Sequence, residues 1–163
     1  MSYCSRVFHI IATRFPRKPV AYLCVLAVWG TTLWFLSAGN PAPKNGPDIP
    51  HLDKVAHFLY FSAGGATLAT CGLVLWPAFK RLQWRLLMAV TLVGSVIGRL
   101  DEYHQTFTPG RSGNDYGDWL ADTLGAAAGA LFVLLIVLPR IRHLGVKSQK
   151  NSEKSQITAN SLD

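Results

Sequence analysis

The feature that most constrains this sequence is a run of twenty residues, Val20–Gly39, that contains no charged side chain. A helix of that length crosses a hydrocarbon core of about 30 Å. Three further apolar stretches follow, and all are expected to be helical because lipid offers no water to unpaired backbone groups. These stretches are Val55–Trp76, Leu86–Gln105 and Gly117–Leu138. The sequence therefore predicts an all-α integral membrane bundle of four transmembrane helices.

The first apolar run has a second interpretation, as a cleaved signal peptide. Ser37, Ala38 and Gly39 would then form a small-residue cleavage site. The apolar part of a signal peptide usually covers only about 7–15 residues. The length of Val20–Gly39 therefore favours an uncleaved helix.

The positive charge of the chain is arranged in blocks between the apolar stretches. The net charge is +7, and twelve of the sixteen Lys and Arg residues lie in 1–19, between the second and third stretches, or in 139–163. A nucleic-acid-binding protein needs a continuous basic face with base-reading groups beside it. This arrangement excludes nucleic acid and indicates membrane lipids as partners. The positive-inside rule then places both termini in the cytoplasm.

This distribution predicts three parts of the chain. Residues 1–19 form a basic cytoplasmic segment, residues 20–138 form the transmembrane domain, and residues 139–163 form a polar cytoplasmic tail without stable structure. The three cysteines support no disulfide framework, since Cys24 and Cys71 lie inside apolar stretches.

Acidic residues gather at the opposite, outer side of the predicted bundle. Given a rise of about 1.5 Å per residue, Asp101 lies about 24 Å along its helix from Arg85. Ionisable groups at such depth are costly unless they face the bundle interior or a wet cavity. Seven of the nine acidic residues belong to this half, namely Asp48, Asp53, Asp101, Glu102, Asp115, Asp118 and Asp122.

Small residues indicate that the helices approach closely below these acids. Gly94 and Gly98 are four residues apart, as are Ala121, Gly125 and Gly129. Small residues at this spacing let membrane helices pack closely. Both stripes run toward the acidic residues, so we expect the polar groups of three helices to converge.

Three stretches around these residues resemble the VanZ-like family. They are Asp53–Phe58 (DKVAHF), Asp101–Arg111 (DEYHQTFTPGR) and Asp115–Gly125 (DYGDWLADTLG). The resemblance covers residues 20–138 and implies a small multi-pass protein of the bacterial inner membrane. The acids, histidine and arginine at headgroup level suggest an envelope lipid or a glycopeptide-related compound as the ligand. Many family members have Asn where this chain has Asp122.

The residue types at the outer side suggest roles in a headgroup site. Arg111 would bind a phosphate or carboxylate with two parallel hydrogen bonds. General acid and base candidates are Glu102, His57 and Asp118. Further ligand-binding candidates are Gln105, Asp53, Asp101 and Asp122.

No cofactor is expected, because no dedicated ligand motif such as H-E-x-x-H is present. Carboxylate oxygens of Asp101, Asp118 and Asp122 nevertheless offer a hard divalent cation a place to bind. The sequence leaves open whether the protein is an enzyme and how many copies assemble. The alternatives are a non-catalytic membrane scaffold or shielding protein, whose polar cluster is a structural ion-pair network, and a subunit of an oligomeric transporter.

Overall fold

The computed structural model describes residues 18–39, 51–111 and 113–143. Within these ranges all regular secondary structure is helical, and the last helix continues to residue 143. The elements are α2 (Pro19–Ser37), α3 (Leu52–Leu75), the 3₁₀ helix η1 (Pro77–Lys80), α4 (Gln83–Gln105), α5 (Tyr116–Phe132) and the π-helical turn η2 (Val133–Val137). Most of the predicted N-terminal segment and C-terminal tail lie outside the described residues.

Each predicted apolar stretch contains a helix, and the boundaries differ by a few residues. The helix α3 begins at Leu52, so Asp53 and Lys54 belong to its first turn. It ends at Leu75, directly before the Trp76-Pro77 pair, because a residue that precedes proline disfavours helical geometry.

Three helices of the described chain are long and apolar enough to cross a membrane. They are α2, α3 and the continuous helix Tyr116–His143. The remaining helix, α4, has 23 residues, but it carries Arg85, Arg99, Asp101 and Glu102. These charged groups lower its hydropathy, so the expectation of four spans is supported for three of the helices.

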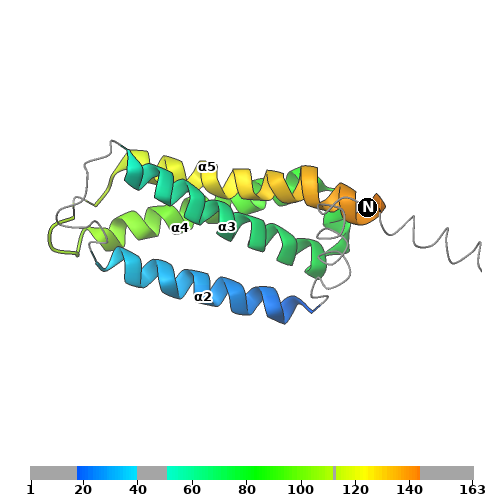
Figure 1. Ribbon diagram of the computed structural model, residues 1–163, viewed down its shortest axis with the longest axis horizontal. Helices are drawn as coiled ribbons and strands as arrows, with labels where there is room; N and C mark the ends of the chain where they lie inside the picture. Colours follow the sequence, from blue (N-terminus) through cyan, green and yellow to red (C-terminus); the bar gives the residue numbers. More distant parts are fainter. Residues whose placement is uncertain (1–17, 40–50, 112, 144–163) are drawn as a thin grey trace, which may run out of the picture.

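The four long helices run along the long axis of the molecule, with α2 on one side (Figure 1). Glycines bring α3 and α5 into backbone contact. A Cβ at Gly65 would collide with the backbone of Ala126, and one at Gly129 would collide with the carbonyl of Ser62. In contrast, α2 contacts α3 and α4 through side chains.

An aromatic pair joins α2 to α3. The Trp29 Nε1–H donates to the Tyr60 carbonyl at 3.1 Å, and the Tyr60 hydroxyl donates to the Trp29 carbonyl at 2.7 Å. The two rings also stack, with centroids 5.5 Å apart.

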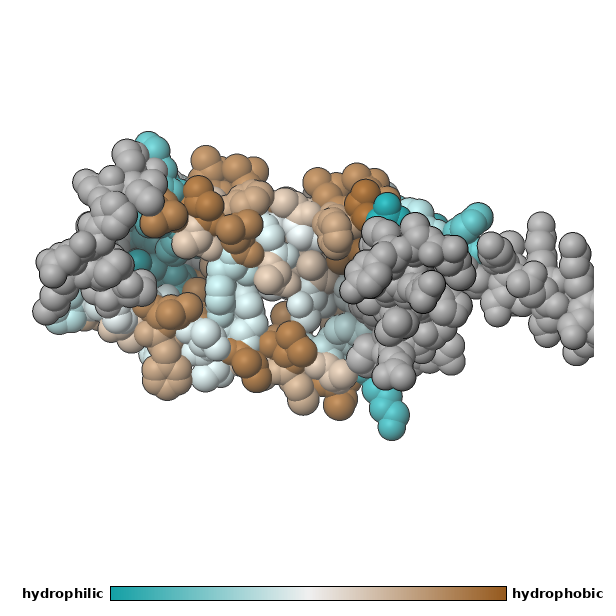
Figure 2. All heavy atoms as spheres, viewed as in Figure 1, coloured by the Kyte–Doolittle hydropathy of each residue, from teal (hydrophilic) through white to brown (hydrophobic). Residues whose placement is uncertain are grey.

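The two ends of the bundle differ in chemistry. An apolar core lies near the end that carries η1, and it contains Ala69, Leu73, Leu86, Val90, Ala130, Val133, Leu134 and Leu138. All buried polar side chains of the described chain lie toward the other end. Hydrophilic residues appear toward both ends of the visible face, and apolar residues lie between them together with residues of intermediate hydropathy (Figure 2). This pattern is typical of a protein whose middle is surrounded by lipid.

Candidate functional site

The candidate site lies where α2 and α4 end and where α3 and α5 begin. The buried polar residues there are Ser37, Asp101, Glu102, Gln105, Asp118 and Asp122. We call these six residues, together with Lys54 and His57, the polar cluster. All four helices therefore contribute residues to the site. The sequence predicts such a contribution for three of them.

Lys54 links the first turn of α3 to the first turn of α5. Its Nζ lies 2.7 Å from Asp115 Oδ2 and 3.0 Å from Asp118 Oδ1. Asp53 is more exposed, and its Oδ2 lies 3.5 Å from the same nitrogen. The Lys54 ammonium therefore offsets the charge of the acids on α5 nearest to it.

Asp115 precedes α5 and caps it. Its Oδ1 accepts a hydrogen bond from the Gly117 N–H at 2.6 Å, which satisfies a backbone donor left open at the helix start. The hydrogen bond from Lys54, together with that of Gly117, holds the pKa of the Asp115 carboxyl below its usual range. Asp115 is thus a charged helix cap at the rim of the cluster.

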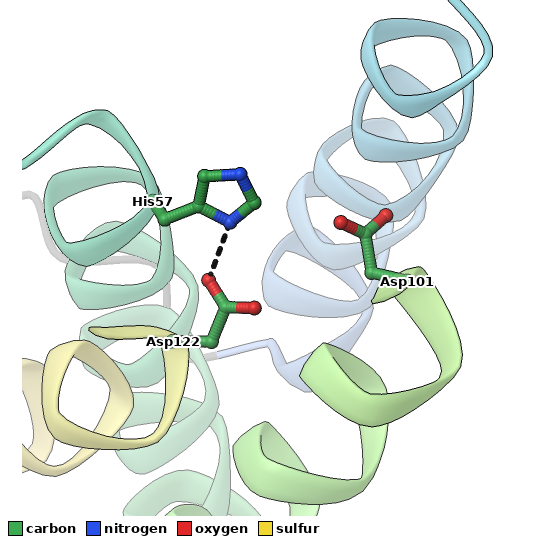
Figure 3. Close-up of side chains that lie close together, drawn as sticks. All are labelled: His57, Asp101 and Asp122. Carbon is green, nitrogen blue, oxygen red and sulfur yellow. Dashed lines mark hydrogen bonds and ion pairs between the residues drawn. The ribbon is translucent and has the colours of Figure 1, made fainter. Parts of the chain in front are cut away.

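His57 on α3 pairs with Asp122 on α5. The Nδ1 of His57 lies 2.9 Å from Asp122 Oδ1, and the Asp122 side chain has no exposed surface (Figure 3). Gly98 of α4 makes room for this carboxylate, because a Cβ there would lie 2.7 Å from both Cβ and Oδ2 of Asp122. The small residue on α4 therefore determines where Asp122 can lie.

Asp101 connects α4 to α2. One of its carboxylate oxygens accepts a hydrogen bond from the Ser37 hydroxyl, and the other accepts one from Gln105 Nε2 at 2.7 Å. Thr108 in the following turn donates to the Ser37 carbonyl at 3.1 Å. The sequence predicts no site role for Ser37, which it places only in a possible cleavage site. One feature of the sequence could have indicated Ser37 as a site residue. It is a polar residue at the end of an apolar helix, at the same level as the acids.

Glu102 holds the loop between α4 and α5. Its Oε2 accepts from the Asp115 backbone N–H at 2.6 Å. Its Oε1 is buried and has no hydrogen-bond partner among the described residues. A carboxylate with no exposed surface and one unsatisfied oxygen is costly in an apolar setting.

Arg111 belongs to the loop between α4 and α5, and its side chain reaches the C-terminal end of α2. Its Nη1 donates to the Gly39 carbonyl at 3.1 Å and lies 3.4 Å from that of Leu36. Gly110 precedes it with φ of +82°, a left-handed conformation that glycine adopts without strain. Arg111 therefore closes the C-terminal end of α2, in addition to its predicted role toward a ligand.

Two hollows meet at the cluster. The first has a volume of about 260 Å³, and we call it the polar cavity after the polar residues on its wall, which include Ser37, Asp53, His57, Asp101, Gln105 and Arg111. Most of its lining surface is nevertheless apolar, and Leu33, Leu36 and Phe61 contribute to it. The second, the apolar groove, has a volume of about 440 Å³ and lies among α2, α3 and α4. The two share Leu33, Phe61 and Asp101. Of the predicted site residues, Glu102, Asp118 and Asp122 do not belong to the wall of either hollow.

The cluster also contains groups of possible metal ligands. One ligand atom each from His57, Asp101 and Asp122 lie within 4.8 Å of one another, and the same holds for His57, Glu102 and Asp118. The structure thus places His57 in both groups and separates Asp118 from the pair Asp101 and Asp122. The sequence instead predicts a cation site from the three aspartates together, without the histidine.

The fold and the cluster define a class, that of helical membrane proteins with a buried polar site at one end of the bundle. A family model, VanZ/LLP1, matches residues 8–137. The chain therefore belongs to the VanZ/LLP1 family, and the resemblance noted in the sequence is confirmed. No curated protein and no solved structure matches the chain.

Proposed function

We propose that all four helices cross the bacterial cytoplasmic membrane, with the polar cluster at the outer face and both termini in the cytoplasm. The buried state of Asp101 and Glu102 supports a spanning α4, since these acids avoid lipid by facing the bundle. Lys80, Arg81 and Arg85 lie at the opposite end, where the positive-inside rule favours the cytoplasm.

We further propose that the protein binds an envelope lipid, with its headgroup in the polar cavity and an acyl chain in the apolar groove. The observation that carries this proposal is the junction of the two hollows at Leu33, Phe61 and Asp101. A lipid has the matching arrangement, with a polar headgroup for the polar cavity and an apolar chain for the apolar groove. Ligand sites are commonly apolar with a few placed polar groups.

Within this function, His57 has the acid or base role. It borders the polar cavity, and its hydrogen bond with Asp122 fixes the orientation of the ring. Glu102 and Asp118 supply charge next to His57, while Arg111 supplies positive charge at the cavity wall. This arrangement suits proton transfer at a headgroup bond.

A substitution that fills the groove tests lipid binding. Gly30 lies on the groove wall, and a Cβ there meets nothing within 4 Å. We expect Gly30→Leu to fold normally and to weaken binding of phosphatidylglycerol about tenfold, or about 1.4 kcal/mol. The measurement is native mass spectrometry of the full-length protein in detergent, titrated with that lipid.

The matched control is Ala27→Leu, which adds similar bulk to the same helix at an exposed position outside the groove. Its lipid binding should equal that of the unmodified chain. Equal binding by Gly30→Leu and the unmodified chain would contradict the proposal.

A second candidate, a non-catalytic scaffold, is favoured by the interhelical links through Lys54 and Asp101. In that case the cluster exists to hold the helices together. If the protein is a scaffold, we expect Glu102→Gln to lower the amount of folded protein in the membrane. Normal abundance of Glu102→Gln with altered handling of lipid supports the site instead.

A further inference from the structure

The polar cluster contains more acidic than basic groups. Among the described residues, Lys54 contacts Asp53, Asp115 and Asp118, and His57 contacts Asp122. Asp101 accepts hydrogen bonds from the neutral donors Ser37 and Gln105. Buried carboxylates without a positive partner are costly, and a bound cation is one way to offset them.

A second, independent observation concerns Asp122. Its Oδ2 is buried and has no hydrogen-bond partner among the described residues. The side chain has no exposed surface, and this second oxygen faces the side of the cluster where Asp101 lies (Figure 3). An unsatisfied carboxylate oxygen in this position is a ready ligand atom.

We propose that His57, Asp101 and Asp122 bind one divalent transition-metal cation of the Mn²⁺ or Zn²⁺ type. One ligand atom from each residue lies within 4.8 Å of the other two, so small side-chain movements bring all three to the distances of about 2.0–2.2 Å at which nitrogen and oxygen ligands bind a shared ion. The set combines one imidazole nitrogen with carboxylate oxygens. Imidazole suits transition metals, whereas Mg²⁺ and Ca²⁺ are bound chiefly by oxygen.

The surroundings of the three residues fit this role. Ser37 and Gln105 hydrogen-bond to Asp101 and hold its carboxylate in place, as outer partners of metal ligands commonly do. His57 and Asp101 both border the polar cavity, which gives an ion a route of entry. The other group containing His57 is less suitable, because its Asp118 already contacts the Lys54 ammonium.

The cation deepens the proposed function, and its part in headgroup binding rests on that function. With the ion bound, the His57 nitrogen that holds it is not free to transfer a proton, and the acid or base role passes to Glu102 beside it. Several carboxylates close to the cavity would repel the phosphate of a headgroup. A divalent cation held by them would instead attract it. Binding of the ion itself is measured without lipid, so that the two proposals can fail separately.

The test uses full-length protein purified in detergent and freed of metal with EDTA. Isothermal titration calorimetry with MnCl₂, ZnCl₂ and MgCl₂ should show one Mn²⁺ or Zn²⁺ per chain and weaker binding of Mg²⁺. We expect Asp122→Asn and His57→Gln each to weaken Mn²⁺ binding by at least about tenfold. The matched control, Asp115→Asn, removes one acid from the same end of the bundle and should leave affinity within about twofold.

A measurement on the unmodified protein avoids reliance on variants that fail to fold. Electron spin-echo spectra of bound Mn²⁺ should show coupling to an imidazole nitrogen. Absence of stoichiometric Mn²⁺ and Zn²⁺ binding by the folded chain would overturn the proposal, as would bound Mn²⁺ without nitrogen coupling. Unchanged affinity in folded Asp122→Asn would do the same. Metal binding as expected, with Gly30→Leu binding lipid normally, would support the ion site and reject the lipid function.

Discussion

At the scale of single residues, Gly98 connects helix packing to site chemistry. It belongs to α4, yet its missing side chain leaves the volume in which the Asp122 carboxylate lies. Asp122 in turn orients His57, on a third helix. A position without any functional group thus controls the geometry of an acid and a histidine.

We expect Gly98→Ala to displace Asp122 and break its hydrogen bond with His57. Overpacking of this kind costs about 1–3 kcal/mol. The measurement is thermal unfolding in detergent, together with the ¹⁵N chemical shifts of the His57 ring. Gly30→Ala is the matched control, since a Cβ at Gly30 meets no atom within 4 Å. An unchanged His57 spectrum in Gly98→Ala would show that Asp122 does not depend on this glycine.

The residue scale also shows what the sequence can predict. Helical spacing and depth indicate that Asp101, Glu102, Asp118 and Asp122 lie at one level, and all four are buried there. The hydrogen bond of Ser37 to Asp101 was not predicted, since it joins residues 64 apart and depends on how α2 packs against α4. The contact of Arg111 with the Gly39 carbonyl likewise depends on tertiary structure.

At the scale of elements, α3 and α5 form the closest pair. Gly65, Gly125 and Gly129 each lie where a Cβ would collide with backbone of the opposite helix. The sequence predicts this close approach on α5, because its small residues recur every four positions. It does not reveal the partner, because repeats of small residues occur on α4 as well.

We expect Gly129→Ala to destabilise the bundle by at least about 1–3 kcal/mol, because the Ser62 carbonyl and the Ala66 backbone cannot move aside cheaply. Thermal unfolding of the purified protein measures the loss. Ala127→Gly, two positions before Gly129 on the same helix, exchanges the same two residue types in the opposite direction and measures the effect of helix propensity. Stability of Gly129→Ala equal to that of the unmodified chain would mean that α3 and α5 separate without cost.

The element α4 shows where apolar length alone is a poor guide. Its 23 residues suffice to cross a membrane, but it carries two acids and two arginines. One arginine, Arg99, lies with its Cζ 5.7 Å from the centre of the Tyr116 ring. Such a cation–π contact keeps a guanidinium close to the bundle.

At the scale of the whole molecule, the buried acids lie at one end of the bundle, and Lys80, Arg81 and Arg85 lie at the other. The proposed orientation places the C-terminus in the cytoplasm. We therefore expect a green fluorescent protein fused after Asp163 to fluoresce and an alkaline phosphatase fused there to be inactive. A phosphatase inserted after Gly110 should be active, because that turn adjoins the polar cluster. The measurement is paired reporter activity in a bacterial host.

The control for these fusions replaces Lys80, Arg81 and Arg85 together with Gln, which removes the positive residues that favour the cytoplasmic side. Mixed reporter activities are then expected. Active phosphatase after Asp163 in the unmodified chain would reverse the proposed orientation.

The two modes of helix attachment bear on how such a protein can diversify. Because α3 and α5 meet through backbone at Gly65 and Gly129, few substitutions are tolerated between them. The groove face of α2 is different, since Gly30 has open space in front of it. We therefore expect selection to adjust ligand preference chiefly through α2. The acidic cluster can then stay constant while the protein acquires new specificities.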